Sequence, residues 1–224
     1  MTQKLSWYKM LSAKIHDFWM NFVQYTKKHK RRIIWSYLAF LTVFAILLLI
    51  DQLTKTFIFK HGNIFESRLY GDSYYVTLEN REVPAESIYP FNREDWIDWG
   101  IIGFRSIYHR GVTILPKGVN ITFIQILSVA ILVVILTVLY FVDWKAAIFL
   151  AIIAAGDAGN MLDRFIFKGH VKDILWVPFM EKSRNLGTFN FADIWIVLGC
   201  GLYVLYLLIE VLSDYISKKT TQHN

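Results

Sequence analysis

The chain has 224 residues, of which 55% are hydrophobic and 19% charged, and its formal net charge is +6. Soluble domains are less apolar and more charged, so the composition favours a membrane protein and excludes disordered and low-complexity chains. A single cysteine, Cys200, excludes an internal disulfide and a multi-cysteine metal site, and positive charge beside apolar runs indicates a membrane surface rather than nucleic acid as a partner.

Residues 1–32 form a basic arm that is predicted to be an amphipathic helix. The arm contains eight Lys or Arg residues but only one acid, Asp17. Helical spacing gathers apolar side chains on one face, namely Trp7, Leu11, Ile15, Phe18 and Phe22. This pattern favours a helix that lies on the anionic inner leaflet of a membrane. The alternative is an ordinary cytoplasmic helix that packs against the rest of the protein.

Four apolar segments follow, and each is a candidate membrane span. Ile33–Ile50 has 18 uncharged residues and Val119–Val142 has 24, and about 20 apolar residues suffice to cross a bilayer. The basic arm and the lysines near the C-terminus place both ends of the chain in the cytoplasm by the positive-inside rule. The number of crossings must then be even, so the third segment, 146–162, is expected to span despite containing Asp157.

The sequence therefore predicts an all-α membrane protein, a four-helix bundle with a small β-structure on its outer side. In chain order we expect a cytoplasmic arm at 1–32, a first span at 33–58, an outer segment at 59–118, a second span at 119–142, a third span at 146–162, an outer connection at 163–188, a fourth span at 189–212 and a cytoplasmic tail at 213–224. Within the outer segment, Ser73–Leu78 and Arg105–Tyr108 are rich in aromatic and β-branched residues, which favours strands.

Four aspartates converge on the outer side of this topology. The first span ends at Asp51, the third at Asp163, and the fourth begins near Asp193, while Asp173 lies in the connection just after the third span. Charged residues at membrane depth are costly and are functional candidates by default. Two carboxylates held close together cannot both ionise cheaply, so one acts as an acid beside a base and the pair can activate water.

Each of these residues also has a simpler interpretation. Asp51 with Lys55, and Asp163 with Arg164, are compatible with ion pairs that mark helix ends. Asp193 has the position of an acid that answers a helix dipole, and an isolated Asp173 is a solvated loop residue. Their common depth in the membrane favours a shared site.

Four short motifs lie in this order on the chain, at the outer ends of the predicted spans. Together they resemble the D-Q-x-T-K, G-N-x-x-D-R, G-x-V-x-D and F-N-x-A-D boxes of the lipoprotein signal peptidase (signal peptidase II) family. The resemblance covers roughly residues 33–212. The motifs are Asp51–Lys55 (DQLTK), Gly159–Arg164 (GNMLDR), Gly169–Asp173 (GHVKD) and Phe189–Asp193 (FNFAD).

The resemblance implies an integral-membrane aspartic peptidase of the bacterial cytoplasmic (inner) membrane, monomeric and free of metal and other cofactors. Such an enzyme removes the signal peptide of prolipoproteins just before a cysteine that carries diacylglycerol, with membrane lipid around its substrate. The implied active site is near the outer face, under a β-cradle, and the implied catalytic dyad is Asp173 and Asp193. The supporting or substrate-binding residues would be Asp51, Lys55, His109, Gly111, Asn160, Asp163, Arg164 and Asn190, with Asp163 supporting the site together with Arg164.

The chain departs from the family pattern at several places. The family carries an N-x-G box in its outer segment, and the nearest equivalent here begins with His109 and ends with Gly111. Asp157 stands where the family usually has a small residue. The stretch between Arg164 and Gly169 is one residue longer than usual, and the outer segment is enlarged around residues 66–100.

Three rival functions follow from the same residues. An inactive or repurposed homologue would keep the fold without the activity, and His109 is the main reason to consider it. A metalloenzyme would use Asp173, Asp193 and His170 as ligands, but no established metal-binding spacing is present. A transporter would use the acids as a polar path across the membrane.

Overall fold

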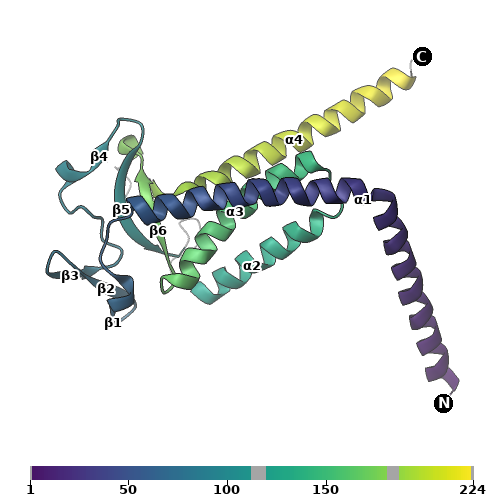
Figure 1. Ribbon diagram of the computed structural model, residues 1–224, viewed down its shortest axis with the longest axis horizontal. Coiled ribbons are helices and arrows are strands. Elements are labelled where there is room, and N and C mark those ends of the chain that lie inside the picture. Colours follow the sequence, from purple (N-terminus) through teal and green to yellow (C-terminus); the bar gives the residue numbers. More distant parts are fainter. Residues whose placement is uncertain (1, 112–119, 181–186, 223–224) are drawn as a thin grey trace.

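Four helices dominate the computed structural model, which describes residues 2–111, 120–180 and 187–222 (Figure 1). Each helix contains a segment long and apolar enough to cross a membrane. The helices are α1 (Thr2–Ile58), α2 (Ile121–Val138), α3 (Trp144–Ile166) and α4 (Phe191–Gln222). The prediction of a helical protein with four candidate spans is therefore confirmed. Residues 112–119, at the end of the predicted outer segment and the start of the predicted second span, and residues 181–186, in the predicted outer connection, lie outside the described residues.

Helix α3 lies at the centre of the bundle, between α1 and α4 (Figure 1). Its buried residues are mostly small, because neighbouring backbones approach it closely. A Cβ atom added at Gly156 would collide with the backbone oxygen of Ala192 on α4. Small residues at such contacts allow the van der Waals packing that holds helices together in lipid. Farther along, Phe40 of α1 packs with Leu139 and Leu150 in a buried cluster.

The helices are longer or shorter than the predicted segments. Helix α1 is a single helix that includes both the arm and the first span, although the arm turns sharply away from the bundle (Figure 1). Helix α3 begins two residues before the predicted 146–162 because the Asp143 side chain accepts a hydrogen bond from the Ala146 amide at 3.0 Å. Helix α4 continues to Gln222, through most of the predicted tail.

Two small antiparallel sheets lie at the end of the bundle opposite the arm (Figure 1). Both predicted strands are present, the first as β2 and the second within β5. The three-stranded sheet contains β1 (Arg68–Tyr70), β2 (Ser73–Leu78) and β3 (Arg81–Pro84), and the four-stranded sheet contains β4 (Ile97–Asp98), β5 (Gly103–Arg110), β6 (His170–Trp176) and β7 (Thr188–Phe189). Short 3-10 helices at Ile64–Glu66, Arg93–Asp95 and Pro178–Met180 connect these elements.

The four-stranded sheet joins the ends of two helices. Strand β6 follows α3 after a short turn, and β7 leads directly into α4. In the ladder between β5 and β6, Ile107 pairs with Asp173 and His109 pairs with Val171. This register brings the outer segment next to the helix ends that carry the predicted site residues.

Candidate active site

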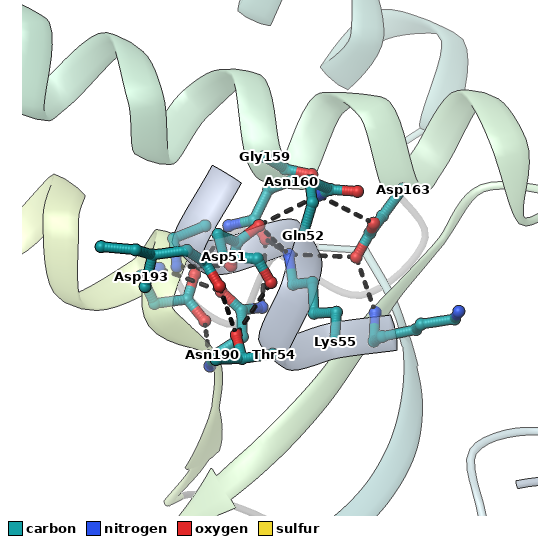
Figure 2. A network of polar contacts seen from close by, with 12 residues as sticks. Asp51, Gln52, Thr54, Lys55, Gly159, Asn160, Asp163, Asn190 and Asp193 are labelled. Carbon is teal, nitrogen blue, oxygen red and sulfur yellow. Dashed lines mark hydrogen bonds and ion pairs between the residues drawn. The ribbon is translucent and has the colours of Figure 1, made fainter. Parts of the chain in front are cut away.

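Lys55 of α1 is the buried cation at the centre of the polar network in Figure 2. Its Nζ atom lies 2.9 Å from Asp51 Oδ2 and 3.0 Å from Asp163 Oδ2 of α3. It also donates a hydrogen bond of 3.3 Å to Asn160 Oδ1. The three donors of the ammonium group therefore have three acceptors, which offsets the cost of burying the charge.

The two carboxylates around Lys55 also tie other elements to the network. Asp51 Oδ1 accepts a hydrogen bond of 2.9 Å from the Ala192 amide in the first turn of α4. Asp163 Oδ2 accepts one of 3.1 Å from the Lys172 amide of β6. These contacts thus position α1, α3, α4 and β6 relative to one another, and Asp51, Lys55 and Asp163 are all buried.

Gln52 is a member of this network that the sequence did not single out (Figure 2). Its Nε2 atom donates to Asp51 Oδ2 at 3.0 Å and to the Gly159 carbonyl at 3.3 Å. The only sequence signal was its place inside the first motif. Gly159 itself is required by space, because a Cβ atom there would lie 2.5 Å from Asp51 Oδ2.

Two asparagine side chains connect this network to the remaining carboxylates. Asn190 Nδ2 donates to Asn160 Oδ1 at 3.0 Å and to Asp173 Oδ1 at 2.7 Å. Asn160 Nδ2 donates to Asp193 Oδ1 at 2.8 Å. Asp173 and Asp193 are therefore linked through a pair of amides whose orientation is fixed by Lys55.

Asn190 and Asp193 also form the start of α4. The Asp193 amide donates to Asn190 Oδ1 at 3.1 Å, and the Asn190 amide donates to Asp193 Oδ2 at 3.2 Å. This reciprocal pair is a capping box, which their spacing in the sequence predicts. One interaction thus begins the helix and fixes the orientation of both side chains.

The two carboxyl groups have different surroundings. Asp173 is buried in β6, whereas Asp193 is partly exposed. Burial raises the pKa of Asp173 well above its ordinary value of 3.8, and the charge of nearby Asp193 raises it further. The arrangement therefore favours a protonated Asp173 close to a second carboxyl group, and a protonated carboxyl group can act as an acid toward a bound substrate.

Arg164 connects the network to the end of the outer segment. Its Nη1 atom donates to the Asn160 carbonyl at 3.2 Å and its Nη2 atom to the Gly111 carbonyl at 2.8 Å. The expected cooperation of Arg164 with Asp163 takes a different form, because Asp163 is ion-paired with Lys55 instead. Sequence adjacency did not reveal this because neighbouring helical residues point in different directions.

His109 lies on β5 near the same charges. It is partly buried, and burial lowers its pKa, although the nearby carboxylates of Glu86 and Asp193 oppose that shift. The neutral imidazole is therefore the favoured form near Arg164, with one nitrogen available as a donor and one as an acceptor.

Asp157 lies apart from the network, nearer the middle of α3. It contacts Ser128 of α2, and its Oδ2 atom is buried without a hydrogen-bond partner.

The structure brings nine of the ten predicted site residues into one set of contacts and leaves His109 at its edge. Those nine are Asp51, Lys55, Gly111, Asn160, Asp163, Arg164, Asp173, Asn190 and Asp193.

Within the described ranges, no three His, Cys, Asp or Glu side chains lie close enough together to hold a metal ion. The predicted metal-ligand alternative placed His170 with the two aspartates. In the structure, His170 Nδ1 lies 3.1 Å from the Phe167 carbonyl, and its ring contacts Tyr74 edge-on with centroids 5.3 Å apart. These contacts are those of a packed, buried side chain.

Comparisons with known proteins agree on one family. The profile of the family described as Signal peptidase (SPase) II matches residues 43–209. Proteins named Lipoprotein signal peptidase from Borrelia turicatae (strain 91E135) and Borrelia hermsii (strain HS1 / DAH) are 32% and 30% identical over 102 residues. Those residues are 45% of this chain, and the chain spans about 60% of the length of the curated relatives it matches.

Two solved structures have a similar fold. Both are described as bacterial membrane enzymes determined by the in meso method, at 2.3 Å and 1.9 Å resolution. They superpose with TM-scores of 0.53 and 0.50 at 17% and 20% sequence identity. The superpositions cover 78% and 75% of this chain, and 90% and 92% of the two solved chains.

Proposed function

Because this chain belongs to the signal peptidase II family, we propose that it cleaves the signal peptide of diacylglyceryl-modified prolipoproteins just before the lipidated cysteine. The observation that carries this proposal is the linkage of Asp173 and Asp193 through Asn160 and Asn190. Two carboxyl groups from different elements are held on a common pair of amides, one group buried and one partly exposed.

In the proposed mechanism, Asp173 is the acid and Asp193 the base. Its deeper burial makes Asp173 the group that keeps a proton, and the Asn190 amide holds its Oδ1 atom in place. Asp193 is the proposed base, and Asn160 and the backbone amide of Asn190 each donate a hydrogen bond to it. The assignment describes the favoured state of a coupled pair, in which each proton affinity depends on the other group.

The reaction adds one water molecule to the scissile amide. Asp193 accepts a proton from the water as its oxygen attacks the carbonyl carbon, and Asp173 gives its proton to the carbonyl oxygen. The bond between carbon and nitrogen then breaks as Asp193 transfers its proton to the leaving nitrogen of the lipidated cysteine. The new carboxyl group returns a proton to Asp173, so that both aspartates regain their starting states.

The remaining predicted residues have supporting roles in this proposal. Lys55, with Asp51 and Asp163, fixes the orientation of Asn160 and so of the dyad. Arg164 holds the Gly111 carbonyl and thereby the end of β5 near the site. We assign the neutral His109 ring a hydrogen bond to the substrate, which an asparagine makes in the family pattern.

The proposed setting is the bacterial cytoplasmic membrane, with both termini in the cytoplasm and the active site near the outer face. The distribution of basic residues supports this orientation, since residues 1–32 carry eight Lys or Arg and one acid. The sheets then form a cradle over the site, and the acyl chains of the substrate lie in the bilayer beside a monomeric enzyme. Lipid itself would provide much of the substrate binding.

A gel-shift cleavage assay in detergent tests the activity. We expect the purified protein to cleave a diacylglyceryl-modified prolipoprotein and to leave the same precursor uncut when its cysteine is unmodified. EDTA should leave the rate unchanged. Failure to cleave a substrate that another signal peptidase II processes, with the fold intact, would contradict the proposal and favour an inactive homologue. Inhibition by EDTA would contradict the aspartic mechanism.

A further inference from the structure

The arm at the start of α1 carries a row of exposed apolar side chains. Ile15, Phe18 and Trp19 are 59%, 71% and 59% exposed, and Leu11 and Phe22 are 38% and 40% exposed. These positions follow helical spacing and lie on one face. Large apolar side chains gathered on one exposed face indicate an interaction surface.

The base of the arm is fixed to the turn between α2 and α3. The Phe22 ring stacks on Tyr140 with centroids 5.2 Å apart, and Thr26 Oγ1 lies 2.5 Å from the Tyr140 hydroxyl. Arg32 Nη2 donates to the Tyr140 carbonyl at 3.0 Å, and Ser36 Oγ donates to the Val142 carbonyl at 2.8 Å. These contacts set both the direction and the rotation of the arm.

The rotation of the arm about its own axis determines which way its apolar face points. Phe22 belongs to the same face as Leu11, Ile15 and Phe18, and its partner Tyr140 follows the end of α2. The apolar face therefore points back toward the level of the spanning helices, while the arm runs sideways from their end (Figure 1). An in-plane helix whose apolar face points toward the bilayer needs no rearrangement to enter it.

The arm also carries a cluster of positive charge. Near its base, four exposed basic residues precede the first apolar span: Lys27, Lys28, Lys30 and Arg31. Lys27 and Arg31 are one turn apart on the face opposite Phe22. Clusters of this kind next to a spanning helix are attracted to anionic lipid headgroups.

We infer that the arm is an in-plane anchor whose apolar face enters the leaflet on the side opposite the candidate active site, and whose basic residues select anionic lipid. The contacts of Phe22 and Thr26 with Tyr140 couple this anchor to the turn between α2 and α3. The inference concerns membrane attachment alone and holds whether or not the protein is a peptidase.

Spin labels on opposite faces of the arm test this geometry. Leu11 and Ala13 differ by about 200° around a helix, and both are exposed. Leu11→Cys and Ala13→Cys would be made in a Cys200→Ser background, since Cys200 is the single cysteine of the chain. The labelled full-length proteins would be placed in nanodiscs of phosphatidylcholine and phosphatidylglycerol in equal parts, and collisions with oxygen and with a nickel chelate would be measured by EPR.

We expect the label at position 11 to collide preferentially with oxygen and the label at position 13 with the nickel chelate. The ratio of oxygen collisions to chelate collisions should be severalfold higher at position 11 than at position 13. Equal exposure of both labels to the chelate would overturn the inference and indicate a solvated arm or one reserved for a protein partner. Protection of position 13 rather than position 11 would show that the rotation is wrong.

A second experiment tests whether the basic residues select anionic lipid. In nanodiscs of phosphatidylcholine alone, or after Lys27, Lys28, Lys30 and Arg31 are all changed to Gln, we expect protection at position 11 to fall. Added salt should weaken the protection in the mixed lipid, because mobile ions screen charges at a surface. Equal protection in both lipids would contradict the proposed role of the basic residues.

Discussion

Asp173 and Asp193 are linked through two hydrogen-bonded asparagine side chains, but they have unlike surroundings. Asp173 comes from a buried strand and bonds to Asn190, whereas Asp193 lies in the first turn of α4 and bonds to Asn160. Burying a carboxyl group favours its neutral form, and a second carboxylate nearby increases that preference. The two carboxyl groups differ in burial, and this difference suits them to the proposed roles of acid and base.

Asp173→Asn should inactivate the protein and stabilise its fold. Removal of a general acid typically lowers a rate by about a hundredfold to ten-thousandfold. The stability effect depends on pH, because the pKa of Asp173 is raised above 3.8. Below pH 3.8 the carboxyl group is protonated in both the folded and the unfolded state. The free energies of unfolding of the wild type and the variant therefore differ by a constant amount there.

Above pH 3.8, the folded wild type retains a proton that the unfolded chain releases, so its stability falls until the raised pKa is passed. The variant lacks this loss, and its advantage in free energy of unfolding should grow over that range. Chemical unfolding in detergent between pH 4 and pH 9 (roughly the range in which a raised carboxyl pKa acts) checks this. Asp72→Asn, at an exposed acid, is the control, and an advantage that shrinks with rising pH would contradict the account.

His109→Asn should retain activity within about tenfold of the wild type, since the account assigns one hydrogen bond to a neutral ring and a bond is worth about 1 kcal/mol. His109→Lys should lose activity. The lysine would bring a positive charge close to Arg164, into a partly buried place that disfavours charge, as the lowered pKa of His109 indicates. Rates of both variants at neutral pH, with the fold checked by unfolding, test this. Full activity of the lysine variant would exclude contact between this position and the site.

The individual residues of the site were largely predictable, but their partners were not. The capping box of Asn190 and Asp193 is a local interaction, and its three-residue spacing can be recognised in the sequence. The pairing of Asp163 with Lys55 required knowing which turn of α1 meets which turn of α3. That contact depends on tertiary packing, which no local pattern specifies.

At the scale of the elements, small residues of α3 decide how closely its neighbours approach. Gly159→Ala would place a methyl group 2.5 Å from Asp51 Oδ2 and 3.1 Å from Ala192 Cβ. We expect a loss of about 1–3 kcal/mol in the free energy of unfolding, typical of overpacking, together with reduced activity. Gly201→Ala on α4 is the matched control, because nothing lies within 4 Å of its added Cβ atom. Equal effects of the two substitutions would contradict the packing argument.

Lys55 joins α1 to α3 through two buried carboxylates. Lys55→Met should reduce the free energy of unfolding by about 3–5 kcal/mol, the usual cost of leaving buried charges unpaired. Activity should fall as well, because Asn160 loses the cation that orients it. Lys60→Met, at an exposed lysine just after α1, should leave both quantities unchanged. A Lys55 variant as stable as the wild type would show that the ion pairs have no structural role.

The presence of the four helices could be predicted from the sequence, but the residues at which they begin and end could not. The apolar runs predicted all four helices, because about 20 apolar residues in a row have few other solutions. The junction between arm and first span did not interrupt α1, since residues 27–32 are good helix formers despite their charge. Helix α4 likewise extends beyond its apolar run to Gln222.

At the scale of the whole molecule, the site exists because residues far apart in the chain meet at one end of the bundle. Asp51, Asp163, Asp173 and Asp193 come from α1, α3, β6 and α4. The alternation of spans predicted that these residues share a depth in the membrane. The sequence also predicted a small β-structure on this side, but not the pairing of β5 with β6, because that pairing joins residues 60 or more positions apart.

The most direct test of the central claim is the cleavage rate of four proteins on a diacylglyceryl-modified prolipoprotein: the wild type, Asp173→Asn, Asp193→Asn and the exposed-acid control Asp72→Asn. Each would first be shown to be folded by its unfolding transition in detergent. We expect cleavage by the wild type and the control and none by either dyad variant. Substantial cleavage by a folded Asp173→Asn or Asp193→Asn protein would contradict it.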